Sequence, residues 1–434
     1  MRDNKVAMHC FTEFGRLFML FFVLQGCLAG LPVYAQEVLE WQQCVSEALK
    51  SRPDLAAAGA SLQQAEAQKR IAVSAGRPQV NASLSGKRSD STQEELDSNS
   101  TFSYGVSASQ LLYDGGVTGS KIEASKETLS AEEQAFRLAS SEARLSLRRA
   151  FVELLKAQKL VVLAKEIEER RRKNVEFLKL RYEAGREHIG SLRRSEADLA
   201  EAEFEVAQAA RGVVLAQSQL ASALGRDERS ILIAEGSFAV EELSEKSPDF
   251  SALAKEHPEV LQFEASVRAA RYELEASKKS FSPELSLNSS FGRSSFESWP
   301  PDELDWSAGF ELSLPLYTGG GTEAAAAKAL GVVNEQISKS RGVYLEVLDM
   351  LEERWKNVRD AAENLKVQEK YLESANLRST IANAQYSNGL ISFDDWVIIE
   401  DNLVNSKKSH LNAQAQLFVA RAEWTQAKGV GLNE

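Results

Sequence analysis

The sequence has little of the chemistry that catalysis or cofactor binding requires. Only three cysteines and four histidines occur in 434 residues. No histidine stands at a metal-ligand spacing from another histidine, a cysteine or a carboxylate cluster. The glycine-rich stretch Gly115–Ser120 lacks the lysine of a phosphate-binding loop. We therefore predict that the protein is not an enzyme and that it uses no cofactor or metal.

Basic stripes and long internal apolar runs are also missing. The formal net charge is −12, and no face rich in lysine and arginine is available to neutralise phosphates, so the sequence argues against nucleic-acid binding. Beyond the N-terminus, no stretch approaches the ~18 consecutive apolar residues of a transmembrane helix. The sequence therefore predicts no membrane-spanning helix.

The N-terminus has the pattern of an export signal. Basic residues flank a polar start, the run Leu17–Leu24 is apolar, and small or apolar residues stand at Val33–Ala35. We predict a signal peptide over residues 1–35 with cleavage after Ala35. An alternative stays open, because Leu24–Cys27 resembles a lipoprotein box in which Gln25 fits poorly. Acylation of Cys27 is therefore undecided.

After cleavage at Ala35 only one cysteine, Cys44, would remain. A single thiol cannot form an intrachain disulfide, whatever the redox state of the compartment.

The rest of the chain is an internal duplication. Prolines, aromatics and glycines recur at a spacing of 204 or 205 residues, which far exceeds the period of solenoid repeats. The matching pairs are Pro53 with Pro258, Pro78 with Pro283, Tyr113 with Tyr317, Gly185 with Gly389, and Gly225 with Gly429. We predict a first repeat over 36–225, a linker over 226–249 and a second repeat over 250–434.

Each repeat has the same predicted order of elements: a helix rich in good helix formers, two strands, one very long helix and a shorter helix. Proline ends the first helix, because its ring cannot continue one. The predicted strands are 79–89 and 101–113, then 284–294 and 305–317. The predicted later helices are 116–182 and 190–225, then 320–387 and 392–427. In the first long helix, apolar or small residues recur every seven positions from Ile122 to Ala164, which indicates supercoiled helices.

The predicted strands alternate between two chemistries. In the second strand Phe102, Tyr104 and Val106 share one face, and the intervening positions are Ser103 and Gly105. Period-two alternation gives each strand one apolar and one polar face. The polar faces hold mostly serine, asparagine and glycine, which line water rather than pack a second sheet.

Each second strand leads into an aromatic residue followed by glycines. The two junctions are Tyr113 with Gly115 and Gly116, and Tyr317 with Gly319 and Gly320. Tyrosine favours the membrane interface, and glycine permits the backbone angles of a sharp strand-to-helix turn.

Two interpretations of these strands remain. In a bilayer, strands can satisfy every backbone amide only as a closed barrel. Four strands are too few to close one, so several copies would have to share a barrel. The predicted fold class is then mainly α with a membrane β-barrel portion that continues into a helical barrel. The alternative is a periplasmic coiled-coil structural or adhesive protein whose strands never enter lipid. A soluble periplasmic binding module is a third reading.

The sequence resembles the TolC-like outer membrane efflux protein family from about Leu39 to Gly431. The resemblance rests on "EALKSRPDL" (Glu47–Leu55), "QLLYDGG" (Gln110–Gly116), "LPLYTGG" (Leu314–Gly320), "RYEAG" (Arg181–Gly185), "YSNGL" (Tyr386–Leu390) and "ALG" (Ala223–Gly225). It implies a homotrimer in the outer membrane of a Gram-negative bacterium, with four strands per chain in one barrel. It also implies a periplasmic adaptor and an inner-membrane transporter of the RND or ABC type as partners in a tripartite efflux pump or type I secretion system.

The resemblance also implies sites at the turns between the long helices. Tyr386, Asp394 and Asp395 fall at the pore constriction, where a ring of like charges would bind cations. A second family aspartate corresponds to Ile398, and the equivalent position in the first repeat is Ser191. The residues implied to contact the adaptor are Tyr182, Gly185, Arg186, Gly389 and Leu390.

Two simpler structural readings belong to this region. Asp395 is also suited to the first turn of a helix whose N-cap is Ser392, because a carboxylate there complements the helix dipole. The charged stretch Glu168–Asn174 is expected to be a solvated helical face whose charges pair across helices.

Overall fold

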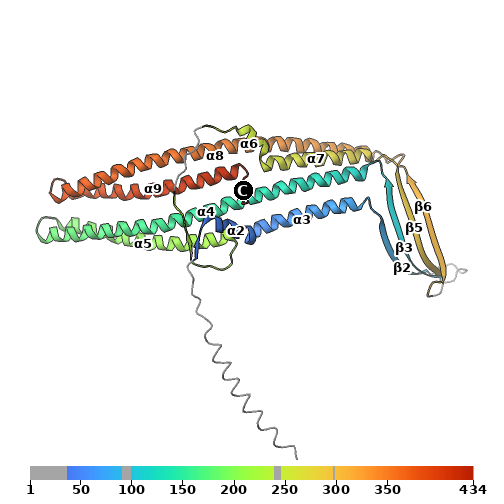
Figure 1. Ribbon diagram of the computed structural model, residues 1–434, viewed down its shortest axis with the longest axis horizontal. Coiled ribbons are helices and arrows are strands. Elements are labelled where there is room, and N and C mark those ends of the chain that lie inside the picture. Colours follow the sequence, from blue (N-terminus) through green and yellow to red (C-terminus); the bar gives the residue numbers. More distant parts are fainter. Residues whose placement is uncertain (1–36, 90–98, 239–245, 297–298, 434) are drawn as a thin grey trace, which may run out of the picture.

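The computed structural model describes residues 37–89, 99–238, 246–296 and 299–433. The molecule is long and narrow, with a sheet at one end and two helical hairpin turns at the other (Figure 1). The predicted cleavage site Ala35 and the alternative acylation site Cys27 lie outside the described residues.

Two helices, α4 and α8, run without a break from the sheet to the hairpin turns (Figure 1). Both have 67 residues, which corresponds to roughly 100 Å at ~1.5 Å per residue. The helices are α2 (Trp41–Ser51), α3 (Pro53–Ser74), α4 (Val117–Glu183), α5 (Ile189–Leu224), α6 (Phe250–Glu256), α7 (Pro258–Lys279), α8 (Gly321–Ser387) and α9 (Phe393–Ala427). The later helices begin and end within one or two residues of the predicted bounds. No described helix is apolar enough over a sufficient length to span a membrane.

The helices form a single layer with two open edges. Near the sheet the packing order is α3, α4, α7, α8; near the turns it is α5, α4, α9, α8. Alanines let neighbours approach closely, and the heptad stripe of α4 is buried at Ala143, Ala157 and Ala164. One edge of the layer is therefore α3 with α5, and the other is α8.

The four long strands form one antiparallel sheet in the order β2-β3-β5-β6. Their bounds are β2 (Gln79–Ser89), β3 (Asn99–Tyr113), β5 (Glu284–Phe296) and β6 (Glu303–Ser313). The register aligns the apolar positions across all four strands: Ala82 lies opposite Val106, Val106 opposite Phe291, and Phe291 opposite Trp306. One face of the sheet consequently carries most of the large apolar side chains, and we call it the apolar face.

The opposite face is lined by serine. Ser85 hydrogen-bonds Ser103 across β2 and β3 at 2.8 Å, and Ser290 bonds Ser307 across β5 and β6 at 2.8 Å. The outer strands β2 and β6 have no partner on their far sides among the described residues. The apolar face, the serine face and the open edges belong to one sheet that does not close on itself.

The exception in the apolar row of β3, Gln110, has a local explanation. Its Nε2 donates to the backbone oxygens of Gly76 at 2.9 Å and of Leu111 at 2.7 Å. It thereby ties the helix end of β3 to the turn after α3. A β-bulge between Leu111 and Tyr113 follows immediately and shifts the register by one residue. Tyr113 consequently lies opposite Leu285 on the apolar face.

The end predicted for the strand over 305–317 is too late in the sequence. β6 ends at Ser313, and Tyr317 lies in the irregular segment before α8, so the prediction that Tyr317 directly ends a strand is wrong. Pro315 explains the difference, because proline has no N–H to donate to a strand ladder.

Both glycine junctions use left-handed backbone angles. Gly116 and Gly320 are the N-caps of α4 and α8 with φ of 85° and 82°, and Gly115 and Gly319 precede them at 68° and 65°. A β-carbon at Gly115 would lie 2.1 Å from that of Ser282 in the turn between α7 and β5. Any larger residue at Gly115 is thus excluded by both backbone strain and space.

A small middle section was not predicted in detail. β1 (Glu37–Leu39) pairs in parallel with β4 (Leu232–Ala234), which lies inside the segment expected to be a linker. The Arg226 guanidinium binds the carboxylates of Glu37 and Glu47, so it joins the end of the first repeat to its beginning. The main hydrophobic core includes residues of these elements and the buried leucines Leu147, Leu154 and Leu220.

Candidate functional site

The hairpin turns at the far end from the sheet place the predicted tip residues at the surface. Both turns end a long helix on a glycine with positive φ, 69° at Gly185 and 75° at Gly389. The side chains of Tyr182, Arg186 and Leu390 are exposed. The side chains at the tips are therefore exposed in the single chain, and their contact with an adaptor stays a prediction.

One predicted gate residue, Tyr386, is a buried link between the two hairpins. It is only 2% exposed, and its ring stacks on Trp396 with centroids 4.7 Å apart. The Arg181 guanidinium lies 4.8 Å from the ring centroid, and the hydroxyl donates to the Glu187 carboxylate. Arg181 and Glu187 belong to the first hairpin, so this cluster joins the α8–α9 turn to the α4–α5 turn.

The groups around Glu187 favour its ionised form. Burial alone would raise the pKa of Glu187, but hydrogen bonds from Tyr386 and Ser191 and the nearby Arg181 outweigh it and lower that pKa. Burial, together with the hydrogen bond to Glu187, raises the pKa of the Tyr386 phenol. The tyrosine is therefore the proton donor and the glutamate a charged acceptor at neutral pH.

The other predicted gate residues, Asp394 and Asp395, are exposed in the first turn of α9. Ser392 is the N-cap: its hydroxyl accepts from the Asp395 backbone N–H at 3.1 Å and donates to the Asp395 carboxylate at 2.6 Å. The simpler reading of Asp395 is thus observed within one chain. Ile398, at the second family aspartate position, is exposed as well.

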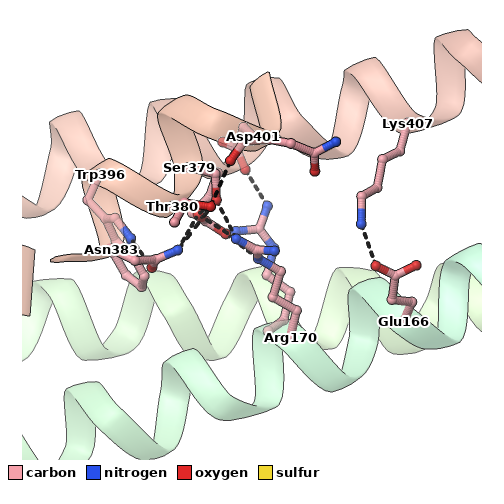
Figure 2. A network of polar contacts seen from close by, with 11 residues as sticks. Glu166, Arg170, Ser379, Thr380, Asn383, Trp396, Asp401 and Lys407 are labelled. Carbon is pink, nitrogen blue, oxygen red and sulfur yellow. Dashed lines mark hydrogen bonds and ion pairs between the residues drawn. The ribbon is translucent and has the colours of Figure 1, made fainter. Parts of the chain in front are cut away.

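A second link between the hairpins lies further from the tips, where Arg170 meets the neighbourhood of Ser379 and Asn383 (Figure 2). Its central residue is Glu400. Glu400 is 1% exposed, and Arg170 of α4 binds both of its carboxylate oxygens, with Nη2 2.9 Å from Oε1. Ser379 donates to the same Oε1 at 2.6 Å, and Asn383 donates to it at 3.2 Å. The buried carboxylate is therefore fully satisfied by groups from α4 and α8.

The two links are connected through Trp396. Its indole Nε1 donates to Asn383 Oδ1 at 2.8 Å (Figure 2). Its ring stacks on that of Tyr386. A continuous set of contacts therefore runs from Arg170 to the turn of the first hairpin at Glu187.

The stretch Glu168–Asn174 only partly faces solvent, contrary to the expectation of a solvated face. Arg170 binds Glu400 and Arg171 binds Asp401, both on α9, whereas Arg172 and Lys173 make surface pairs within α4. The expected pairing across helices is present. Sequence reasoning missed Glu400 itself, whose only signal was a carboxylate in an otherwise apolar helical stripe.

No group of histidine, cysteine or carboxylate side chains within the described ranges is arranged to hold a metal ion. The sites at the opposite end, Tyr113, Gly115, Gly116 and their second-repeat counterparts, lie where the sheet meets the helices and contact neither hairpin link.

Comparison with known proteins identifies the family. The sequence profile described as "Outer membrane efflux protein" matches residues 44–226 and 250–430, one segment per repeat. The cation efflux system protein CusC of Escherichia coli O6:H1 is 22% identical over 383 residues, which cover 85% of this chain and 81% of CusC. The outer membrane efflux protein BepC of Brucella suis is 23% identical and covers 94% of this chain and 89% of its own.

The fold agrees with solved channel structures. The open-state outer membrane channel MtrE of Neisseria gonorrhoeae superposes with a TM-score of 0.79 at 20% identity, covering 90% of this chain and 89% of MtrE. The sequence profile covers most of the chain. The chain belongs to the outer membrane efflux protein family.

Proposed function

We propose that the chain is one subunit of a homotrimeric exit duct in the outer membrane, which extends into the periplasm of a Gram-negative cell. It passively conducts substrates delivered by an inner-membrane transporter of the RND or ABC type through a periplasmic adaptor. The duct would serve a tripartite efflux pump or a type I secretion system.

The observation that carries this proposal is the two-faced open sheet. Large apolar side chains on one face are exposed in the single chain, and they include Trp306 and Phe310, each 73% exposed. Exposed apolar area on this scale marks a surface that meets another apolar phase. Lipid on the apolar face and water on the serine face satisfy both sides.

The open edges explain why several copies are needed. An unpaired strand edge cannot lie in lipid, so β6 of one copy must pair with β2 of the next. The helical layer, like the sheet, has two different open edges. Exposed apolar residues such as Tyr371 and Leu377 lie on α8 at one edge, and Phe204 and Val214 lie on α5 at the other. Two different edges that bind head to tail close into a ring.

Three copies give a barrel of twelve strands, which exceeds the roughly eight strands of the smallest membrane barrels. Twelve strands leave room for a water-filled lumen lined by the serine face. The helices of the three chains would then enclose the periplasmic part of the duct.

The links at the tips would control this duct. The Tyr386–Glu187 and Arg170–Glu400 contacts fasten the two hairpins of one chain to each other, so opening the periplasmic mouth by moving one hairpin relative to the other requires these contacts to break. The exposed tip residues Tyr182, Arg186 and Leu390 lie beside them, within reach of an adaptor.

Planar-bilayer recording tests the proposal. The purified protein should elute in detergent with the mass of three chains and should insert stepwise into a planar bilayer as ion-conducting units. Release as a monomer by osmotic shock, with no conductance from any oligomer, would overturn it in favour of a periplasmic structural or adhesive protein.

We expect Asp395→Asn to weaken block of the channel by divalent cations several-fold. In the trimer three Asp395 carboxylates would form a ring, and removing their charge removes the attraction for a cation. Asparagine still accepts the hydrogen bond from Ser392, so the melting temperature should stay unchanged. Asp394→Asn is the control, and loss of block in that variant alone would assign the ring to Asp394.

The Tyr386–Glu187 link should make the closed state sensitive to acid. Because folding lowers the pKa of Glu187 below its ordinary value of 4.5, the link is complete above that value and is lost as pH falls through the lowered pKa. Conductance of the wild type should therefore rise in acid. Tyr386→Phe removes one of the hydrogen bonds to the half-buried Glu187 carboxylate, at a cost of about 1.5–3 kcal/mol for a bond to a charged group, and should conduct more already at pH 7.

Tyr182→Phe is the matched control for this experiment, because the exposed Tyr182 hydroxyl is at the same tip but outside the cluster. It should conduct as the wild type does. Equal conductance of Tyr386→Phe and wild type at pH 7 would contradict a gating role for the link.

A further inference from the structure

Charged residues on the strands are sorted between the two faces of the sheet. Four carboxylates occur at paired positions of the described strands. The register places all of them on the serine face: Glu284, Glu303, Asp305 and Glu311. Arg88 and Arg293 instead lie on the apolar face. Arg88 is on the same side of β2 as Leu84, and Arg293 is on the same side of β5 as Phe291. The apolar face therefore carries positive charge and no negative charge within the described strands.

Both arginines lie toward the end of the sheet that is remote from the helices. Arg88 is the last residue but one of β2, and Arg293 is three residues before the end of β5. Arg293 lies between Tyr104 on β3 and Leu304 on β6. Both side chains are exposed, and in the described part of the chain neither has a hydrogen-bonding or ion-pair partner.

Aromatic rings surround this part of the apolar face. Trp299, from the segment between β5 and β6, packs edge-on against Phe102 at 6.0 Å and against Tyr104 at 6.4 Å. Tryptophan and tyrosine concentrate where the hydrocarbon of a bilayer meets its headgroups. Arg88 and Arg293 are therefore at headgroup level if the apolar face meets lipid.

We propose that Arg88 and Arg293 form a binding site for the phosphate groups of an anionic membrane lipid on the outer surface of the barrel. This inference rests on the proposed function, because it requires the apolar face to be in a membrane. A guanidinium presents several N–H donors in one plane and binds phosphate by paired hydrogen bonds. The flanking rings and apolar residues would hold the acyl chains of the same molecule.

A lipid fits these residues better than a soluble anion does. Two unpaired guanidinium groups on the face that carries Leu84, Val106, Phe291 and Trp306 would be unfavourable in hydrocarbon unless an anion reached them there. A lipid phosphate arrives attached to the apolar chains that the surrounding surface requires.

The test measures the melting temperature of the trimer in phosphatidylcholine vesicles, with and without the phosphorylated glycolipid lipid A. We expect lipid A to raise the melting temperature of the wild type. The double variant Arg88→Gln/Arg293→Gln should lose most of this shift, and Arg88→Lys/Arg293→Lys should retain part of it. Lys87→Gln is the matched control, since Lys87 is next to Arg88 but lies on the serine face.

Three results would overturn the proposal: no shift in the wild type, a full shift in the glutamine double variant, or an equal shift when inorganic phosphate replaces lipid A. Conductance of the same samples in phosphatidylcholine bilayers separates this from the function itself. A conducting trimer without a lipid A effect refutes only the lipid site, whereas absence of conductance refutes the duct.

Discussion

Replacing Arg170 by alanine is expected to destabilise the protein by about 3–5 kcal/mol, the usual cost of leaving one partner of a buried ion pair without its counter-charge. Glu400 would keep only the neutral donors Ser379 and Asn383 while remaining 1% exposed. The loss should appear as a lower melting temperature and as a higher conductance at neutral pH, because the same contact holds α9 to α4.

The matched control is Arg172→Ala, two residues away on the same helix. Arg172 pairs at the surface with Glu168 and Glu169, and such pairs contribute about 0–1 kcal/mol. A second control, Arg170→Met with Glu400→Leu, removes both charges and should recover most of the stability, while the acid sensitivity of the Tyr386–Glu187 link stays as in the wild type. If Arg170→Ala and Arg172→Ala melted alike, the buried network would not hold the hairpins together.

The second large effect is expected at two adjacent residues on β3. Val106 lies on the apolar face in the middle of the sheet, opposite Ala82 and Phe291, and Ser107 lies on the serine face opposite Asn81 and Ser290. Val106→Arg should cost about 2–4 kcal/mol where the face meets the centre of a bilayer. We expect this variant to be depleted from outer-membrane fractions and to yield little trimer.

Ser107→Arg should assemble normally, because the new side chain would extend into water. Its effect should be on the pore: three added positive charges in the lumen lower conductance and shift selectivity away from cations. Fractionation, size measurement and bilayer recording of the two variants provide the comparison. Equal assembly of both would contradict lipid contact on the apolar face.

Elements with a strong local pattern could be predicted from the sequence. The long helices needed only the absence of proline over more than sixty residues, and the strands needed only their alternation. Ser392 was identified as an N-cap because the capping preference is a property of residues three positions apart. The error at β6 is also local, since Pro315 interrupts the strand within a run of apolar residues.

Contacts between distant residues could not be predicted. Arg170 and Glu400 are 230 positions apart, and nothing in either neighbourhood specifies the other. The same holds for Glu187 with Tyr386, and for Arg226 with Glu37 and Glu47. Such pairs depend on the relative rotation of helices, which follows from packing of the whole layer rather than from any single periodicity.

The steric fit at Gly115 has a consequence for the symmetry of the assembly. In the first repeat this glycine abuts Ser282, in the turn that opens the second repeat's sheet, whereas Gly319 at the equivalent place has open space around it. By the duplication spacing, the counterpart of Ser282 is Arg77, and α3 with β2 forms the free edge. In the closed ring of three chains that we propose, Gly319 would therefore abut the following molecule, and the ring would contain six nearly equivalent glycine junctions, two from each chain.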